Sequence, residues 1–600
     1  MKPALRILTV SLALLICSIN LSAQWKGSAE LSLGAGGMAK VDPEEDGLGH
    51  YYVSGAFSLG HTAPKFQWNT SLNCVFETKE TEVDRISITG MKTEKPSFKA
   101  VIKFSEQKPL NIRWRSEAGF TPTTAQRYSA WVQYRYRSNP SKNQNVDIGG
   151  DLDLEIDDID LSMFKVNIED QKLTEHVVEA GARSQLQLGS PRKVLFSELT
   201  GTVSILDRTS DWDIQSATSN DSDDMDYSAH IYRINSASTD PSFSLSIHLR
   251  DSLLTGETKF VFNPGFRVLL GNNLNRNSGA TNTGESDQWR DSVRLRENFN
   301  FLEVRGEPFV AGDLRREKLH IAFDYALQLY SKRLNDDTHT QEIGLQQPRP
   351  VGSSTVEWLI SNNHRISFGN TISVQYPSYL QICWYDRPGE YVNQLIRGNI
   401  NLLPTSTVSF RTNYAFTQRR FGASVSASIG KKNDEIDRTY VNETIEGRKY
   451  KVFTWVNAAD SWIGTASARM TWTDSRFSAG MSADYRQNLR RVRATGEEKR
   501  SFDWNFKTNA AVDLGKGWNI GADLTFQSKV ATFFTMFSQY CTLNASISKS
   551  FKHFTLFLNG RDLLDTELTT EYLSEDESEC WQETALNNRR LVILGARWNF

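Results

Sequence analysis

The sequence has few of the features that mark soluble metalloproteins, disulfide scaffolds or helical membrane proteins. Its 600 residues include only 5 cysteines, with no CxxC pair and no dense framework, so neither a zinc site nor a disulfide scaffold is indicated. The formal net charge is −3 and the isoelectric point is about 6.4, which argues against nucleic acid as a partner. Beyond the amino terminus, no segment approaches the roughly 20 apolar residues that a spanning helix needs.

Catalytic and cofactor motifs are also missing. The 9 histidines are dispersed, with no HExxH and no pair at ligand spacing. There is no GxSxG elbow and no phosphate-binding loop, and Gly34, Gly36 and Gly37 read as strand glycines. We therefore expect no cofactor and predict that the protein is not an enzyme. A serine and a histidine brought together at the rim of the fold would be the remaining route to catalysis.

The amino terminus carries the longest apolar run. Lys2 and Arg6 precede an apolar stretch over residues 7–19, and small residues follow it. This order predicts a secretory signal peptide over residues 1–23, which is removed to leave residues 24–600 as one unit. A lipoprotein would use Cys17, but Ile16 stands where a lipobox needs a small residue.

The last ten residues alternate with a period of two, which is the pattern of a β-strand with two different faces. One face consists of Val592, Leu594, Ala596, Trp598 and Phe600. A closing strand with an aromatic carboxyl terminus resembles the signal that the outer-membrane assembly machinery recognises, and Val592, Leu594, Trp598 and Phe600 would carry it. The alternative is the edge strand of a soluble β protein.

The same alternation recurs along the chain and is cleanest over residues 318–331 and 408–429. Turns are short on one side and long on the other, and aromatic residues cluster at strand ends, as in outer-membrane barrels. The girdle candidates are Trp472, Phe477, Trp518 and Phe526. We predict an all-β fold, a single antiparallel transmembrane barrel of about 20–22 strands in a Gram-negative outer membrane. A mean hydropathy of −0.46 is compatible with this fold, because half of each strand faces a wet lumen.

Two kinds of charged rows have the spacing of lumen-facing strand residues. The basic row consists of Arg113, Arg115, Arg135 and Arg137, and the acidic row of Asp151, Asp153 and Glu155. Charges spaced by two on a strand need solvent or a polar interior, so we predict that both rows line the lumen and balance each other. A calcium loop is the alternative for the acidic row, although the glycine and the bidentate glutamate of an EF-hand are missing.

Two short motifs resemble the TonB-dependent-receptor-like outer-membrane β-barrel family of the Bacteroidetes. The segments are Tyr376-Pro377-Ser378 with Gly398 to Thr405, similar to the family pattern RPS…GNPxLxPE, and Asp562 to Asp565, similar to its D-[LI]-F-N element. The residues that match are Pro377, Gly398, Asn399, Leu402, Pro404, Asp562 and Asp565. The chain departs from the pattern at Tyr376, Ile400 and Thr405, so it would be a divergent member. In the family, these residues shape turns and strand entries.

The resemblance implies a barrel in the lipid bilayer, but no plug pattern precedes the strands, so we expect a plugless relative. Its role would be solute passage or a scaffold, with a surface lipoprotein or other outer-membrane subunit as a possible partner. The alternatives are a TonB-dependent transporter component whose plug is supplied in trans or not recognised, and an outer-membrane enzyme. Because a barrel this wide would leak, we expect loops near Asn220, Asn272 and residues 335–350, or a partner, to occlude it.

Overall fold

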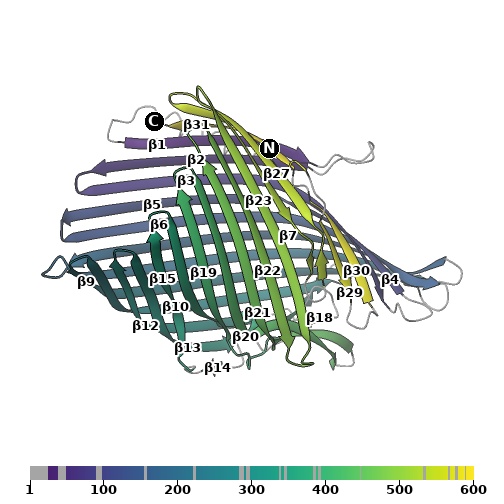
Figure 1. Ribbon diagram of the computed structural model, residues 1–600. Helices are drawn as coiled ribbons and strands as arrows, with labels where there is room; N and C mark the ends of the chain where they lie inside the picture. Colours follow the sequence, from purple (N-terminus) through teal and green to yellow (C-terminus); the bar gives the residue numbers. More distant parts are fainter. Residues whose placement is uncertain are drawn as a thin grey trace.

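The chain closes into one large β-barrel, drawn in Figure 1. The computed structural model describes residues 25–37, 49–89, 97–153, 158–219, 225–282, 290–291, 297–336, 340–343, 347–382, 387–388, 394–445, 448–531, 535–564, 568–573, 579–587 and 590–599. Within these ranges, no helix is long and apolar enough to cross a membrane.

The barrel wall is a ring of 22 antiparallel strands, which confirms the predicted fold class and strand number. The first eleven are β1 (Trp25–Gly37), β2 (Gly49–Ala63), β3 (Phe66–Thr89), β5 (Leu110–Thr123), β6 (Gln126–Asp153), β7 (Asp158–Gln187), β8 (Lys193–Ser219), β9 (Met225–Thr255), β10 (Thr258–Asn282), β12 (Glu297–Arg316) and β13 (Leu319–Asp336). The others are β15 (Arg349–Ser361), β16 (His364–Gln375), β19 (Thr405–Gln418), β20 (Phe421–Ile445), β21 (Arg448–Thr473), β22 (Phe477–Val492), β23 (Glu498–Gly515), β24 (Trp518–Gln527), β27 (Tyr540–Ser550), β28 (Phe554–Arg561) and β31 (Leu591–Asn599).

The ring closes where the first strand meets the last. Residues Ser28 to Ala35 of β1 pair with Val592 to Asn599 of β31, so every wall strand has two neighbours. Closure satisfies the backbone N–H and C=O groups that an open sheet would expose. A two-sheet sandwich, the soluble alternative, is therefore excluded.

Connections at the two ends of the barrel differ in length. At one end, which we call the turn end, two to five residues join consecutive strands, as between β2 and β3 or between β7 and β8. At the other, the loop end, the wall continues into short additional pieces. They are β4 (Ser97–Gln107), β11 (Arg290–Asp291), β14 (Thr340–Ile343), β17 (Arg387–Pro388), β18 (Gln394–Ile396), β25 (Val530–Ala531), β26 (Thr535–Phe537), β29 (Leu568–Leu573), β30 (Glu579–Asn587) and the single-turn helix α2 (Tyr379–Ile382).

The wall is much taller on one side than on the other. Strands β7 and β9 have 30 and 31 residues, whereas β24 has 10 and β28 has 8. At about 3.3 Å per residue, the tall strands run roughly 100 Å along their own axes, far more than a membrane crossing needs. They form the long blue side of Figure 1.

Above the short hairpin of β1 and β2, the wall closes a second time. Residues Thr81 to Thr89 of β3 pair directly with Glu579 to Asn587 of β30, the strand before β31 in the chain. Strands β1 and β2 therefore take part in the ring only at the turn end. At the loop end, the ring is closed by the pairing of β3 with β30.

The polar segment from Asn272 onward corrects one of our predictions. We expected a loop near Asn272, but β10 continues to Asn282, and residues 258–277 pair with β12 throughout. Ladder hydrogen bonds hold a strand together without an apolar face once it has left the membrane.

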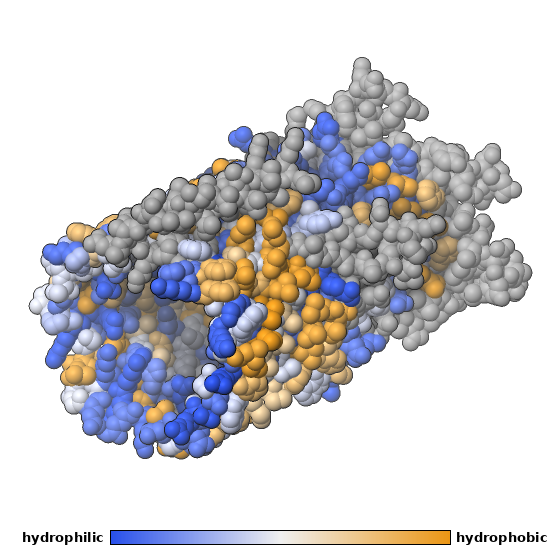
Figure 2. Space-filling model, turned by 90° about the horizontal axis from the view of Figure 1, so that it is seen from above, coloured by the Kyte–Doolittle hydropathy of each residue, from blue (hydrophilic) through white to orange (hydrophobic). Residues whose placement is uncertain are grey.

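The two faces of the wall have different chemistry. Outward side chains such as Trp462, Val425 and Leu594 are apolar and largely exposed, and Figure 2 shows an apolar band between hydrophilic zones on the visible side. The girdle candidates Trp472, Phe477, Trp518 and Phe526 are 36–44% exposed and lie at strand ends, as predicted. This is the surface that a bilayer requires.

Candidate functional site across the barrel lumen

The segment between β16 and β19 is the part of the chain that folds over the inner face of the wall. Its described parts are residues 376–382, 387–388 and 394–404. On β13, Leu319 and Leu327 are exposed on the outer face, while Tyr330, Lys332 and Leu334 share the opposite face and are almost fully buried. The residues that bury them come from this segment, which we call the inner segment.

An apolar cluster anchors the inner segment to the wall. It consists of Phe301, Leu334, Ile382 and Leu402, each at most 6% exposed. Phe301 and Leu334 are directly opposite one another on β12 and β13, and Ile436 and Trp455 pack against the group from β20 and β21. Side chains from four wall strands and from two parts of the segment therefore pack together in one buried apolar cluster.

Aromatic stacking and a buried lysine continue this contact toward the turn end. The rings of Tyr330 and Tyr376 stack at 3.7 Å between centroids, and Lys332 Nζ donates a hydrogen bond of 2.7 Å to the carbonyl of Pro377. The Arg305 guanidinium lies 5.8 Å from each ring centroid. Burial raises the pKa of the Tyr376 phenol, so its hydroxyl keeps its proton at neutral pH.

Asparagines fix the second half of the inner segment. Asn399 Nδ2 donates to the Trp455 carbonyl at 2.9 Å, and the backbone N–H of Asn399 donates to Gln381 O at 2.6 Å. Asn457 of β21 accepts from the Leu403 N–H and donates to Leu403 O and Asp434 O, all within 3.0 Å. These bonds tie the inner segment to β21.

The inner segment also joins the wall as a strand. Residues Gln394 to Ile396 pair in parallel with Lys451 to Phe453 of β21, on the edge that β22 leaves free. Arg397 forms a 3.0 Å ion pair with Glu443. To reach this edge from β16, the chain passes β19 and β20 on the lumen side, so the segment spans part of the opening.

A charged network lies beside the inner segment, at a bulge in β20. Glu435 accepts from Lys432 at 2.8 Å and from Ser461 at 2.7 Å, and Arg490 reaches Asp437 at 2.6 Å. In the loop after β22, hydrogen bonds from Arg493 to Asp460 raise the pKa of the arginine. Nothing in the spacing of these residues along the sequence indicated that they would meet.

The predicted basic row lies on the inner face, but the acidic row does not balance it. Arg113 faces Arg135 across β5 and β6, and Arg115 pairs with Glu117 at 3.0 Å. Arg137 and Asp151 are 14 residues apart on the same strand, about 45 Å at 3.3 Å per residue. Arg115 has a carboxylate partner in Glu117, whereas Arg113 donates to the amide oxygen of Gln133 at 2.9 Å.

Several predicted residues fall elsewhere. Glu155, Asp565 and Phe600 lie outside the described residues. Val592, Leu594 and Trp598 face outward and are 37–61% exposed, on the strand that closes the ring. Asp562 adopts a φ of 45° directly after β28, and its N–H donates to Asn544 at 2.8 Å, which agrees with a turn role.

The matched motif residues of the inner segment come together. Pro377, Gly398, Leu402 and Pro404 are all buried, and Asn399 makes the contacts described above. Sequence reasoning gave them turn roles and missed that the turns carry the chain across the lumen. The available signal was the loss of alternation between residues 376 and 404.

Metal binding requires a set of ligand side chains, and thiol chemistry requires a cysteine in a suitable environment. No group of three or more histidine, cysteine or acidic residues is placed to hold a metal in this part of the chain. Cys74 and Cys541 lie on half-buried strand positions.

Removing Asn457 is expected to loosen the inner segment without opening the wall. Asn457→Ala deletes three hydrogen bonds to backbone groups of Leu403 and Asp434, at about 1–3 kcal/mol in total. Trypsin cleavage at Arg397 should then accelerate at least about tenfold, as measured by limited proteolysis of the purified protein. Asn413→Ala on the inner face of β19, away from the segment, is the matched control. Equal cleavage rates in the two variants would contradict the assigned anchor.

Comparison with known proteins agrees with this architecture. The sequence of residues 349–598 matches the outer membrane protein beta-barrel family. The match covers 250 of the 600 residues, so the likeness to that family concerns the carboxyl-terminal part of the chain. Its short turns therefore face the periplasm and its loop end faces the cell exterior, in the outer membrane of a Gram-negative bacterium. A search of curated proteins finds no match to the sequence.

Solved structures of the same fold are TonB-dependent receptors and transporters. The ferric citrate transporter FecA in its unliganded form is 9% identical, with a TM-score of 0.58, covering 97% of this chain and 79% of its own. The copper transporter OprC is 11% identical, with a TM-score of 0.58 and coverages of 96% and 80%. The siderophore receptor PiuA from Acinetobacter baumannii is 12% identical, with a TM-score of 0.56 and coverages of 96% and 82%. At these identities, the likeness concerns the fold alone.

Proposed function

We propose that this protein is a noncatalytic, plugless outer-membrane barrel that lets small hydrophilic solutes pass, and that the inner segment narrows its extracellular entrance. The observation that carries the proposal is the inner segment, which crosses a lumen lined by accessible charges. Arg115, Arg267 and Asp324 are 40–47% exposed on the inner face of a closed ring, so water reaches them. A wet, charged lumen suits the passage of polar solutes rather than a filled interior.

Support for a plugless barrel comes from the chain itself. The described segments between Trp25 and Asn599 are wall strands or the connections between them, and β1 already takes part in closing the ring. The inner segment would take over part of the barrier role that a plug has. Residues 1–23 would direct export, and the closing strand with Trp598 would be the part that the assembly machinery reads.

Swelling of liposomes that contain the purified protein tests the proposal. We expect uptake of a pentose, slower uptake of a disaccharide and no uptake of a large dextran, without any energy source. Absence of pentose uptake would overturn passive passage. Uptake in cells that requires both TonB and a proton-motive force would instead support the transporter that the fold relatives suggest.

A scaffold is the second candidate, because the tall wall projects far beyond the membrane. Strands β7 and β9 extend by many residues past the length of a crossing, and their surfaces could hold a surface lipoprotein or another outer-membrane subunit. Cross-linking in native membranes tests this role. A stoichiometric partner captured through the tall wall would support it, and an uncross-linked barrel would argue against it.

A further inference from the structure

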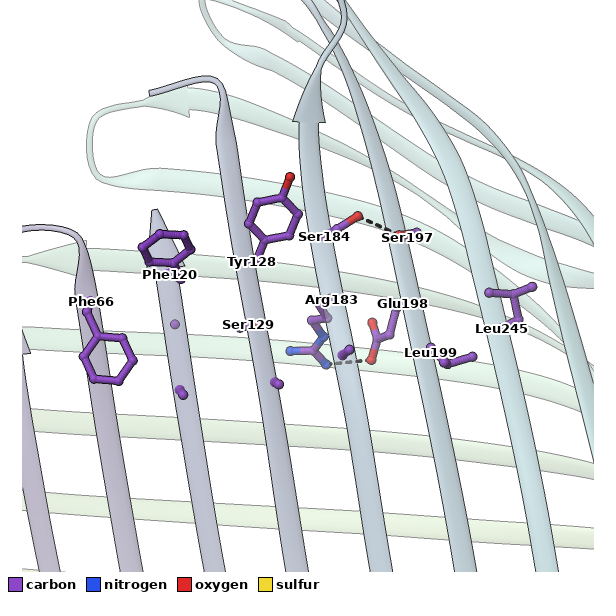
Figure 3. A pocket seen from close by; sticks show the side chains of 14 residues that line it. Phe66, Phe120, Tyr128, Ser129, Arg183, Ser184, Ser197, Glu198, Leu199 and Leu245 are labelled. Carbon is purple, nitrogen blue, oxygen red and sulfur yellow. Dashed lines mark hydrogen bonds and ion pairs between the residues drawn. The ribbon is translucent and has the colours of Figure 1, made fainter. Parts of the chain in front are cut away.

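A groove of about 400 Å³ lies on the wall near the turn end and has no part in the lumen. Residues of β3, β5, β6, β7, β8 and β9 line it, and Figure 3 shows it from close by. Three rings from neighbouring strands, Phe66, Phe120 and Tyr128, stand in a row along one side. Leu199 and Leu245 stand on the other side.

Small side chains make the floor of the groove. The floor residues are Ala118, Gly119, Ser129, Ala130, Ala182, Ser184 and Ser197. Arg183 and Glu198 also line the groove, but they form an ion pair of 2.8 Å with each other, as Figure 3 shows. The hydroxyls of Ser184 and Ser197 bond to each other at 2.7 Å, so this pair is satisfied without a ligand. The recess thus offers van der Waals contact on three sides and little hydrogen bonding.

The groove faces the bilayer rather than the lumen. Phe66, Phe120 and Tyr128 are 37–48% exposed and share the outward face with Trp114, whereas Arg113 and Arg115 alternate to the inner face. The rings lie within a few residues of the periplasmic turns, and Phe66 is the first residue of β3. The groove therefore lies in the periplasmic half of the membrane, where the lipids are phospholipids.

Three exposed cations flank the groove at its periplasmic end. Lys65 precedes Phe66 directly, and Arg192 and Lys193 end the turn between β7 and β8. Lys193 is four residues from Ser197, about 13 Å along the strand. The three turns below the groove, residues 64–65, 124–125 and 188–192, contain no acidic residue, although Asp251 of β9 lies directly opposite Lys193, so Arg192 and Lys193 together still leave a net positive charge. Positive charge at the membrane surface attracts anionic headgroups.

We propose that the groove binds one acyl chain of an anionic phospholipid, with the headgroup phosphate on Arg192 and Lys193. An acyl chain on a flat wall touches protein on one side only. In the groove it is held between the aromatic row and the two leucines, and its headgroup reaches the cations without leaving the interface. The geometry thus combines apolar contact with charge at the spacing of a single lipid.

Native mass spectrometry of the purified full chain, titrated with phosphatidylglycerol or phosphatidylcholine, tests the proposal. We expect phosphatidylglycerol to be retained preferentially. Ala182→Leu fills the floor and should reduce its retention about tenfold. Ala427→Leu, at an exposed outward position of β20, is the matched control and should retain the lipid as the wild type does.

Charge is tested separately. The double variant Arg192→Gln, Lys193→Gln should lose the preference for phosphatidylglycerol over phosphatidylcholine, whereas Lys318→Gln, in another periplasmic turn, should keep it. Equal retention by Ala182→Leu and Ala427→Leu would overturn the site, as would equal binding of the two lipids by the wild type. If the wild type forms dimers and Ala182→Leu abolishes them while lipid retention is unchanged, the groove would be a contact between two copies of the protein and not a lipid site. Heat-modifiable migration in gels establishes that each variant is a folded barrel.

Discussion

Replacing Ile382 by aspartate is expected to turn a narrowed barrel into a wide and persistent pore. Ile382 is 1% exposed within the apolar cluster of Phe301, Leu334 and Leu402. A carboxylate at this position would be buried in apolar surroundings, at a cost on the order of 3 kcal/mol. The substitution also removes the apolar contacts that anchor this part of the segment, and none of the hydrogen bonds described above involves the Ile382 side chain. The segment should then leave the wall.

The wall itself should survive this substitution, because its strands are held by ladder bonds that do not involve Ile382. In planar bilayers, we expect single-channel conductance to rise severalfold over the wild type. Leu403→Asp is the matched control: Leu403 is a neighbour on the same segment, but it is 49% exposed and should tolerate a charge. A wild-type barrel that already conducts as widely as Ile382→Asp would refute the narrowing role of the inner segment.

What the sequence predicts about this molecule is local, and what it misses is non-local. Alternation over residues 318–331 gives β13 almost to its ends, and the short turns at Arg419 and Lys516 follow from a few residues each. Both of these turn residues adopt positive φ, of 42° and 52°. Such features depend on neighbours in the chain and therefore leave a readable pattern.

The inner segment leaves no comparable pattern. Its anchors lie on strands that begin at residues 297, 319, 421 and 448, and the pairing of β18 with β21 joins positions more than 50 residues apart. The second closure, between β3 and β30, joins residues nearly 500 positions apart. Motif resemblance marked Gly398 and Pro404 as important, but only the fold shows that they carry a chain across the lumen.

Gly352 is expected to be a wall position that accepts only glycine. It has a φ of 148° on β15, where it pairs with Tyr325 of β13. An added Cβ would overlap the Asp324 carbonyl oxygen and would lie 2.7 Å from the Tyr325 Cα, so the backbone itself is in the way. Strain and overlap together should cost at least about 3 kcal/mol.

Because the clash begins at the first added atom, Gly352→Ala and Gly352→Val should be almost equally damaging. Both should lower the urea midpoint of unfolding or leave no heat-resistant barrel in gels, since loss of the pairing between β13 and β15 would open the ring. Gly464→Val on β21 is the control: nothing lies within 4 Å of its added Cβ, so the substitution should be tolerated. If alanine at position 352 left the midpoint unchanged while valine lowered it, side-chain size rather than backbone geometry would be the constraint, and the strand could be re-engineered with small residues. If both were tolerated, β13 and β15 would be able to move apart enough to accept a side chain at position 352. Closure of the ring would then depend more on the pairing of the other strands.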